Sequence, residues 1–341
     1  MGLINEIQSL PSSDSSDLHL DHPTSDECTH PPNYRPIFCS CETFYKHSLT
    51  SDSNGNVQEA IIHCIASVFC SEDYRGRGYA ARLMKELAKI LRQWQSDSHE
   101  AKVAGSVLYS DIGKVYYAKL EWIPNPTNTH VEFPAMEIPR SSLIRDILEN
   151  ELFERCKRDQ LMIREAMAIL TPGTPRRGVI LPDLDHMLWH VRKENFATNH
   201  LFKKQAPVQA WAIWTRRYYG RHDSESSNNV LYILRLVVEG DPSANSPRSI
   251  NVREVGLPED QAVYLEAVLQ AAQAEAAEWH LDHVQLWEPS TCVQHVISNG
   301  NIAHAVVGRQ DDSNASGLWI DADIDARTQP VWINNEYYAW C

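Results

Sequence analysis

Hydrophobic and polar side chains alternate along residues 37–49 and 60–70, and this period of two predicts two β-strands. The segment between them contains Asn54-Gly55, a pair that favours a tight hairpin turn because both residues tolerate positive φ. Apolar residues then recur every three or four positions over residues 80–94, which predicts an amphipathic helix. A short strand at 105–109 and a helix near 112–120 complete the pattern of the first half.

The second half repeats this order of elements. A helical stretch over 141–170 is expected to bridge the two halves, and residues 171–178, rich in Pro and Gly, read as a linker. After it the pattern predicts a helix at 184–201, strands at 208–219 and 230–239, a helix at 259–279 and a strand at 284–287. The polar segment 240–257 is expected to be a surface loop. Because strand, strand, helix and strand follow one another in both halves, the second is interpreted as a diverged copy of the first.

Charge and composition exclude some classes of function. The formal net charge is -14, with 45 acidic and 31 basic residues, so no basic surface is available for phosphate neutralisation and no nucleic-acid partner is expected. The longest apolar runs fall short of the about 18 residues that a membrane span needs, and the first thirty residues lack the features of a signal peptide. The sequence therefore predicts a soluble cytoplasmic protein without a membrane partner.

The eight cysteines do not form a metal-binding pattern. Cys39 and Cys41 are two positions apart, but no paired C-x-x-C or histidine motif accompanies them. Their spacing places both on one face of a strand, as is typical of buried thiols. No metal site is predicted.

The segment 67–80 carries the strongest chemical signal. A hydrophobic strand leads into a turn with Gly76 and Gly78, and an amphipathic helix begins at once. Such a turn exposes successive backbone N–H groups at a helix N-terminus, where the helix dipole also favours an anion. It is neither a Walker loop nor the G-x-G-x-x-G fingerprint, since no Gly-Lys-Ser/Thr follows and the spacing differs. The pattern indicates a cradle for a phosphate or pyrophosphate.

This segment resembles the R/Q-x-x-G-x-G/A motif of the GNAT acetyltransferases, matched here by Arg75, Gly78 and Ala80. The resemblance implies that the loop amides bind the pyrophosphate of acetyl-CoA and that the strand before them pairs with pantetheine. The residues that it implies for acetyl-CoA binding are Ser67, Val68, Phe69, Arg75, Gly76, Arg77, Gly78, Tyr79 and Ala80.

The chain also resembles a narrower family, the fungal lysine N6-acetyltransferases, over about residues 36–341. This resemblance rests on three further sequence segments, "LYSDIGK", "YAKLEW" and the terminal "NEYYAWC". This family implies an α+β fold, with a mixed, mostly antiparallel GNAT sheet flanked by helices and a second GNAT-like α/β domain. It also implies acetyl-CoA as co-substrate and a small amine, L-lysine at N6, as acceptor. The second domain has no glycine-rich turn and is not expected to bind coenzyme A.

The expected organisation follows from these matches. Residues 1–33 form a disordered acidic, Ser-rich tail, 34–140 the acetyl-CoA-binding domain, 141–178 the connector and 179–341 the C-terminal GNAT-like domain. The opening strand and two helices of the GNAT fold have no counterpart before residue 37, so the first domain is expected to lack its N-terminal part. The last ten residues are apolar enough to dock between the domains and help line the acceptor site.

Glu121 stands where the GNAT motif usually has glycine. Glycine there suits a left-handed helix end, a conformation that is unfavourable for glutamate. The helix end is therefore expected to be remodelled.

Two residues are candidates for catalysis. By the family match, Tyr117 is the acid that protonates the departing thiolate; the alternative is a core aromatic facing the sheet. His63, on the strand that enters the anion loop, is the candidate base, and a hydrogen-bonded sheet histidine is as probable an interpretation. Asp111 is interpreted as a helix cap rather than a catalytic group.

Three functions remain open from the sequence. The leading one is acetyl transfer to a small amine, L-lysine by resemblance. The second is acylation of another amine, such as an intermediate of a fungal secondary-metabolite pathway. The third is a catalytically inactive protein that binds coenzyme A or acts as a scaffold.

Overall fold

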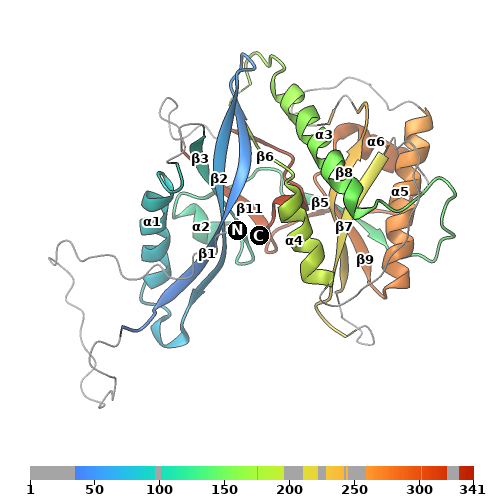
Figure 1. Cartoon of the computed structure of the whole chain (residues 1–341). Coiled ribbons are helices and arrows are strands. Elements are labelled where there is room, and N and C mark those ends of the chain that lie inside the picture. The colour runs from blue at the N-terminus through green and yellow to red at the C-terminus, as the bar shows by residue number, and fades with distance from the viewer. Residues whose placement is uncertain are drawn as a thin grey trace.

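The computed structural model describes residues 35–96, 101–174, 176–195, 210–221, 228–241, 243–244, 259–300, 302–320 and 330–341. The predictions for residues 1–33 and for most of 240–257 lie outside the described residues. Two β-sheets stand side by side, each covered by helices on its outer face (Figure 1). The fold is therefore the predicted mixed α/β fold, with a mostly antiparallel first sheet and two GNAT-like units.

The first sheet has seven strands in the order β12-β6-β1-β2-β3-β11-β4. Their bounds are β1 Cys39–Ser51, β2 Val57–Cys70, β3 Lys102–Ser110, β4 Ile123–Pro124, β6 Arg177–Ile180, β11 Asn314–Trp319 and β12 Val331–Ile333. The predicted hairpin of β1 and β2 is confirmed, with Gly55 at φ 80° in its turn. β2 lies in the middle of the sheet and is buried at every position from Ala60 to Ile65, because both of its faces are covered.

The second sheet has five strands in the order β10-β5-β9-β8-β7. Their bounds are β5 Thr129–Pro134, β7 Ala210–Arg217, β8 Val230–Val238, β9 His283–Trp287 and β10 Ala305–Gly308. β8 and β9 are parallel and are joined through a helix, as are β2 and β3. The predicted repetition of strand, strand, helix and strand is therefore confirmed.

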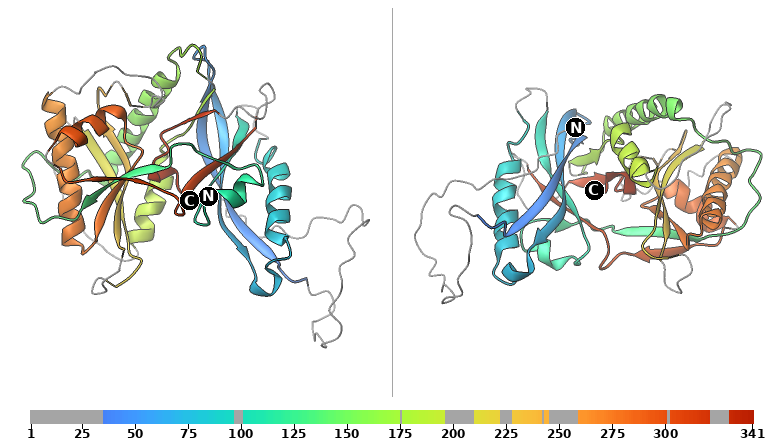
Figure 2. Two further views of the ribbon diagram at one scale, coloured as in Figure 1. Left: turned by 180° about the vertical axis from the view of Figure 1, so that it is seen from behind. Right: turned by 60° about the horizontal axis from the view of Figure 1, so that its bottom comes forward.

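Strands of the two sheets alternate along the chain instead of separating at one boundary. β5 belongs to the second sheet although it precedes residue 140, and β11 and β12 return to the first sheet from the end of the chain. As a result, the chain crosses between the halves more than once (Figure 2).

Six α-helices lie among the described residues: α1 Tyr79–Leu91, α2 Val115–Ala118, α3 Glu149–Met167, α4 Leu184–Asn195, α5 Glu259–Glu278 and α6 Thr291–Asn299. α1 and α2 cover the outer face of the first sheet, whereas α5 and α6 cover that of the second. The structure thus confirms the predicted helix over 259–279.

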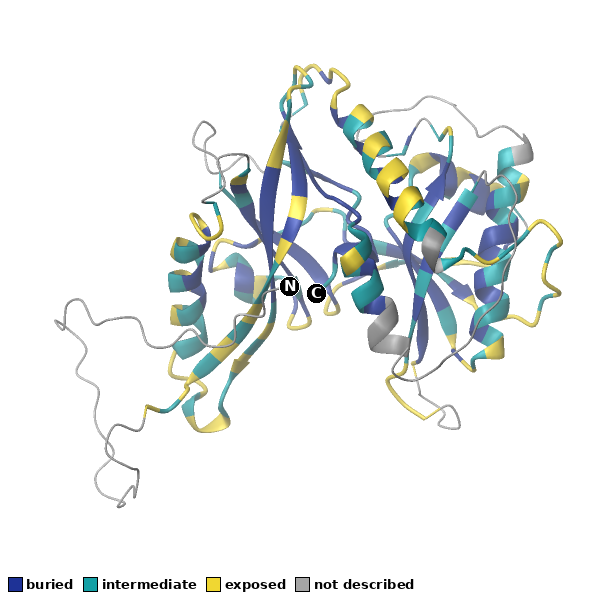
Figure 3. Ribbon diagram, viewed as in Figure 1, coloured by how far each residue is buried: buried dark blue, intermediate teal, exposed yellow. Residues whose placement is uncertain are grey.

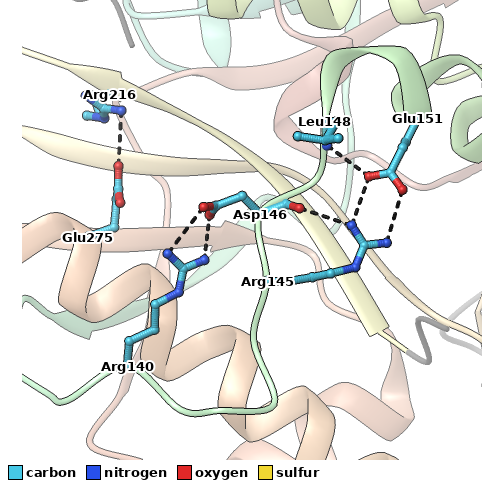
Figure 4. A network of polar contacts seen from close by, with 7 residues as sticks. All are labelled: Arg140, Arg145, Asp146, Leu148, Glu151, Arg216 and Glu275. Carbon is cyan, nitrogen blue, oxygen red and sulfur yellow. Dashed lines mark hydrogen bonds and ion pairs between the residues drawn. The ribbon is translucent and has the colours of Figure 1, made fainter. Parts of the chain in front are cut away.

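The bridging helix begins later than the predicted residue 141. Residues 141–148 are not helical, and α3 begins at Glu149. The Glu151 carboxylate accepts hydrogen bonds from Arg145 and from the Leu148 backbone N–H, 2.9 Å and 3.0 Å away (Figure 4). The bonds from Arg145, and then the one from Leu148, lower the pKa of the Glu151 carboxyl to about 2. This contact satisfies a backbone donor at the helix start and explains where the helix begins.

The prediction that the helix end at Glu121 is remodelled was wrong. Glu121 adopts the left-handed conformation, with φ 78°, and the Trp122 N–H donates to the Tyr117 carbonyl at 3.0 Å. This is the hydrogen bond of a Schellman motif, made here with glutamate in the position that favours glycine. Trp122 is fully buried and its Nε1 donates to Ser106 Oγ at 3.1 Å, which holds the chain in this conformation.

One hydrophobic core lies between the two sheets. Ile62, Cys64 and Val107 of the first sheet pack in one cluster with Tyr232 and Trp287 of the second. The C-terminal segment enters this core through η2, Tyr337–Ala339, whose three residues are buried. Figure 3 shows the corresponding buried positions along the strands that face the centre of the molecule. The prediction that the last residues dock between the halves is confirmed.

No helix in the described part of the chain is both long and apolar enough to cross a membrane.

Candidate functional site

The loop between β2 and α1 has the geometry of an anion cradle. After the short helix η1, Glu72–Tyr74, Gly76 and Gly78 take φ 75° and 82°, values that L side chains rarely adopt. An added Cβ at either glycine would meet no atom within 4 Å, so the surface of the loop is open. Gly78 caps α1, whose first backbone N–H groups have no acceptor within the helix. No acidic side chain lies in this first turn, so an approaching anion meets no negative charge there.

The predicted arginines lie beside this cradle with exposed aromatic rings. Arg75 donates from Nε to the Cys70 carbonyl at 3.1 Å and its guanidinium lies 5.9 Å from the Phe69 ring centroid. Arg77 lies 5.8 Å from the ring centroid of Tyr74. Arg75 also pairs with Glu72 at 3.4 Å, but its side chain is 56 % exposed and Glu72 is more exposed still, so a phosphate can compete for the guanidinium. Tyr79 stacks on Phe38 and extends this aromatic surface at the start of α1.

The parallel strands β2 and β3 diverge just before the loop. They pair from Ala60 opposite Lys102 to Ile65 opposite Leu108, after which β2 continues with β1 alone. Ser67 lies beyond this point with φ 51°, and its Oγ donates to Glu42 Oε2 at 2.9 Å. The wedge between the strands leaves backbone groups of β2 without a partner from β3, and an extended ligand can bind to such groups.

Tyr117 lies on α2 at the outer side of this wedge. It belongs to the same hydrophobic cluster as Ile65 and Leu108, the last residues at which β2 and β3 pair with each other, and its ring contacts the ring of Tyr116 edge-on. Burial, then the neighbouring Tyr116 and Asp111, raises the pKa of Tyr117 to about 12. A phenol is protonated at neutral pH at its ordinary pKa of 10 and remains so after this shift, as a proton donor must be.

His63 lies on β2 two residues before the divergence and is almost fully buried. Its Nε2 is 3.2 Å from the Trp94 carbonyl, beyond the end of α1. Burial lowers the pKa of His63, although the bond to Trp94 opposes this effect. The structure brings Tyr117 to the wedge and the predicted loop residues to one surface, but it directs His63 Nε2 towards Trp94.

A second cluster of polar groups, absent from the sequence prediction, lies on the inner side of the wedge. Lys46 of β1 is only 4 % exposed, and its Nζ contacts His186 Nε2 of α4. Cys341 packs against the neighbouring strand β2, with its Sγ 3.7 Å from the Ile65 carbonyl. Burial lowers the pKa of Lys46, whereas the nearby Cys64 and Cys341 thiols oppose this shift. Alternation along β1 places Lys46 on the buried face with Phe44, which was the only available signal in the sequence.

Lys46→Met is expected to flatten the pH dependence of stability. The unfolded chain binds a proton at Lys46 more tightly than the folded chain, so wild-type stability from this residue rises as pH increases towards 10.5, the ordinary lysine pKa. Lys46→Met is expected to lack this rise. The control is Lys89→Met, which replaces an exposed lysine and is expected to retain the rise. Urea unfolding at neutral and alkaline pH measures the free energy of unfolding. If this free energy changed equally with pH in the wild type and in Lys46→Met, the prediction would be wrong.

Among the described residues no group of three or more His, Cys, Asp or Glu side chains is arranged to hold a metal ion. Asp111 accepts hydrogen bonds from Ser313 N and Oγ at 3.0 Å and 3.4 Å, so it ties β3 to the turn before β11.

Two protein families match the chain. The family described as LYC1 GNAT-like C-terminal domain matches residues 130–341, and the acetyltransferase (GNAT) family matches residues 49–109. The second match includes β2, the anion loop, α1 and most of β3.

Two curated proteins match part of the chain at low sequence identity. An uncharacterised protein of Saccharomyces cerevisiae is 24 % identical over 196 residues, 50 % of this chain and 46 % of that protein. A lysine acetyltransferase of Yarrowia lipolytica is 28 % identical over 96 residues, 25 % of this chain and 24 % of that protein. The chain thus spans less than half the length of the curated relatives that it matches.

Solved structures with a similar arrangement have little sequence identity. A GCN5-related N-acetyltransferase from Anabaena variabilis has 14 % identity and a TM-score of 0.43, covering 81 % of this chain and 59 % of that one. Saccharomyces cerevisiae N-myristoyltransferase with bound myristoyl-CoA has 9 % identity and a TM-score of 0.41, covering 81 % and 67 %.

Proposed function

Because the chain belongs to the family of the LYC1 GNAT-like C-terminal domain, with a GNAT acetyltransferase match before it, we propose that it is an N-acetyltransferase that uses acetyl-CoA and a small amine. The observation that carries this proposal is the anion loop, in which Gly76 and Gly78 have positive φ and open space around them at the start of α1, where the first backbone N–H groups of the helix can bind an anion. Arg75 and Arg77 add positive charge beside it. The pyrophosphate of acetyl-CoA fits this combination.

The wedge between β2 and β3 supports the position of the thioester arm. The last residue of β2 that pairs with β3 is Ile65. Beyond it lie Ser67, Val68 and Phe69, and their backbone groups are the ones that an extended pantetheine chain would meet. Tyr79 and Ala80 begin α1 and complete the loop. Acetyl-CoA supplies an activated acyl group, and these residues bind and orient it.

In the proposed reaction the amine nitrogen forms a bond to the acetyl carbon and the carbon–sulfur bond breaks. Tyr117 gives its phenolic proton to the leaving thiolate. Deprotonation of the ammonium requires a base, for which His63 is proposed through Nδ1, since Nε2 contacts the Trp94 carbonyl. The contacts of Tyr117 at the wedge support its role more directly than those of His63 do.

L-Lysine is the proposed acceptor. Its support is the resemblance of "LYSDIGK" and "YAKLEW" to the fungal lysine N6-acetyltransferases and the match to the Yarrowia lipolytica lysine acetyltransferase. Release of free thiol from acetyl-CoA, measured with L-lysine and with a panel of other amines, tests this choice. Thiol release with another amine, and none with L-lysine, would reject lysine while retaining acetyl transfer.

Gly78→Val is expected to weaken acetyl-CoA binding about tenfold or more, because loss of one charge-assisted hydrogen bond has an effect of this size. Valine disfavours the φ of 82° at this residue and covers the loop amides. Calorimetric titration of the whole chain with acetyl-CoA measures the affinity. The matched control is Gly173→Val, since Gly173 has φ 75° and open space around it but lies in the linker before β6. Equal affinities of the two variants, or no saturable binding to the wild type, would contradict the proposed loop function.

A further inference from the structure

A cavity of about 750 Å³ lies between the two halves, away from the anion loop. α3 and the end of β8 form part of its wall. The segment from the end of β9 into α6 and residues after β8 also line it. Further lining comes from residues after β4 and from β12, and these two strands are opposite edges of the first sheet. The curled first sheet therefore closes around this space together with the second half. Its volume is in the range of pockets that bind small molecules.

The described lining of this cavity is strongly acidic. It contains five carboxyl groups and one guanidinium, which are Asp159, Glu165, Asp241, Glu288, Glu336 and Arg235. Asp159 and Arg235 neutralise each other through two hydrogen bonds of 2.8 Å. Glu336 shares Arg235 with Asp159, and burial raises the pKa of its carboxyl to about 7, although Arg235 opposes this shift. The other three carboxyl groups, Glu165, Asp241 and Glu288, leave the lining with an excess of formal negative charge, which favours a cationic ligand.

Two buried polar atoms at the wall lack a partner. The Glu336 carboxyl accepts from Arg235 through Oε1 and interacts with the Leu236 backbone N–H, but its Oε2 atom has no hydrogen-bond partner of good geometry within the part of the chain that the structure describes. The indole Nε1 of Trp332 is likewise without an acceptor among the described residues. Both residues are 8 % exposed and line the cavity. Buried polar groups are normally hydrogen-bonded, so an unsatisfied acceptor and donor here indicate a ligand that carries both functions.

The form of the lining indicates an organic ligand rather than a metal ion. No described group of three or more potential ligands converges as a metal site requires. Between the carboxyl groups lie apolar side chains, among them Met162, Val293 and Ile333, which can cover a methylene chain.

We propose that this cavity is a binding site for a small aliphatic amine that also carries a hydroxyl or carboxylate oxygen. The ammonium group binds Glu336, the oxygen accepts from Trp332 Nε1, and the methylene chain lies along the apolar wall. No lining residue belongs to the anion loop, so this binding does not depend on acetyl-CoA.

Calorimetric titration of the full chain with aminopentanol tests the proposal, and pentanediol is the matched ligand without a positive charge. Saturable binding of aminopentanol and none of pentanediol is expected. Equal binding of the two compounds, or no saturable binding of aminopentanol up to about 10 mM, a range that includes weak fragment-sized ligands, would overturn the proposal.

Variants then locate the site. Glu336→Gln is expected to weaken aminopentanol binding about tenfold or more, because it removes the buried charge that pairs with the ammonium group. Trp332→Phe removes the indole N–H and is expected to weaken binding about threefold. Glu165→Gln removes a negative charge from an exposed side chain at the rim of the cavity and is also expected to weaken aminopentanol binding. Its affinity tests the negative charge of the cavity even if Glu336→Gln does not fold.

The control is Glu86→Gln, which removes the same charge from α1, where Glu86 pairs with Lys89. It is expected to bind aminopentanol as the wild type does. Weakening by Glu86→Gln equal to that by the cavity variants, or unchanged affinity in all of the cavity variants, would reject the assignment.

Discussion

Tyr117→Phe is expected to lower kcat for acetyl transfer about 100-fold or more, the usual contribution of a positioned general acid. The phenol is protonated at neutral pH even at the ordinary tyrosine pKa of 10, and burial raises this pKa further, to about 12. Tyr117 packs in one hydrophobic cluster with Ile65 and Leu108, where the strands diverge. Phenylalanine keeps this packing and removes only the proton donor. The expected result is therefore a loss of kcat with little change in acetyl-CoA affinity or in thermal stability.

Tyr116→Phe is the matched control for this substitution. Tyr116 is the neighbouring residue on α2 and is partly exposed, and the two rings contact each other edge-on. Removal of the Tyr116 hydroxyl is expected to change kcat by less than about twofold, as is usual for a group that takes no part in the reaction. Steady-state measurement of free thiol release compares the variants. If both substitutions reduced kcat equally, or if neither did, Tyr117 would not be the acid.

The elements around the anion loop could be predicted because their signals are local. The hairpin of β1 and β2, the glycine turn and the amphipathic α1 each show their pattern within a few consecutive residues. The same holds for the repeated order of elements in the second half. Local patterns also identified the loop residues that the structure places together on one surface.

The pairing of distant strands could not be predicted in this way. β5 and β11 were not among the predicted strands, and a local pattern contains no information about which sheet a strand joins. The error at Glu121 has a related cause. The left-handed conformation costs about 1–2 kcal/mol locally, but the burial of Trp122 and its hydrogen bond to Ser106 offset this cost. That contact depends on tertiary packing.

The inner polar groups were missed for the same reason. Asp159 and Arg235 are 76 positions apart in the sequence, and Lys46 meets His186 across 140 positions. Each residue alone has the character of an ordinary surface charge. Only the packing of the two halves reveals that they are buried and paired.

Asp159→Ala is expected to lower the free energy of unfolding by about 3–5 kcal/mol, as does removal of one partner from a buried ion pair. Asp159 of α3 is fully buried and accepts two hydrogen bonds from Arg235 of β8, which also contacts Glu336 of the C-terminal segment. The substitution leaves a buried guanidinium with one carboxylate fewer. It also weakens the attachment of α3 to the second sheet and to the chain end. Urea unfolding, with the midpoint and slope fitted together, measures the loss.

Asp146→Ala provides the comparison, since Asp146 also pairs with an arginine, Arg140, at 2.5 Å (Figure 4). Both of these side chains are more than half exposed, so solvent screens the pair and the expected loss is below about 1 kcal/mol. A triple replacement, Asp159→Leu with Arg235→Met and Glu336→Gln, removes all three buried charges of this group and is expected to recover much of the stability lost in Asp159→Ala. If Asp159→Ala were as mild as Asp146→Ala, the buried pair would not connect the two halves energetically. If instead the triple replacement were less stable than Asp159→Ala, the pairing itself, rather than the avoidance of an unpaired buried charge, would stabilise the junction.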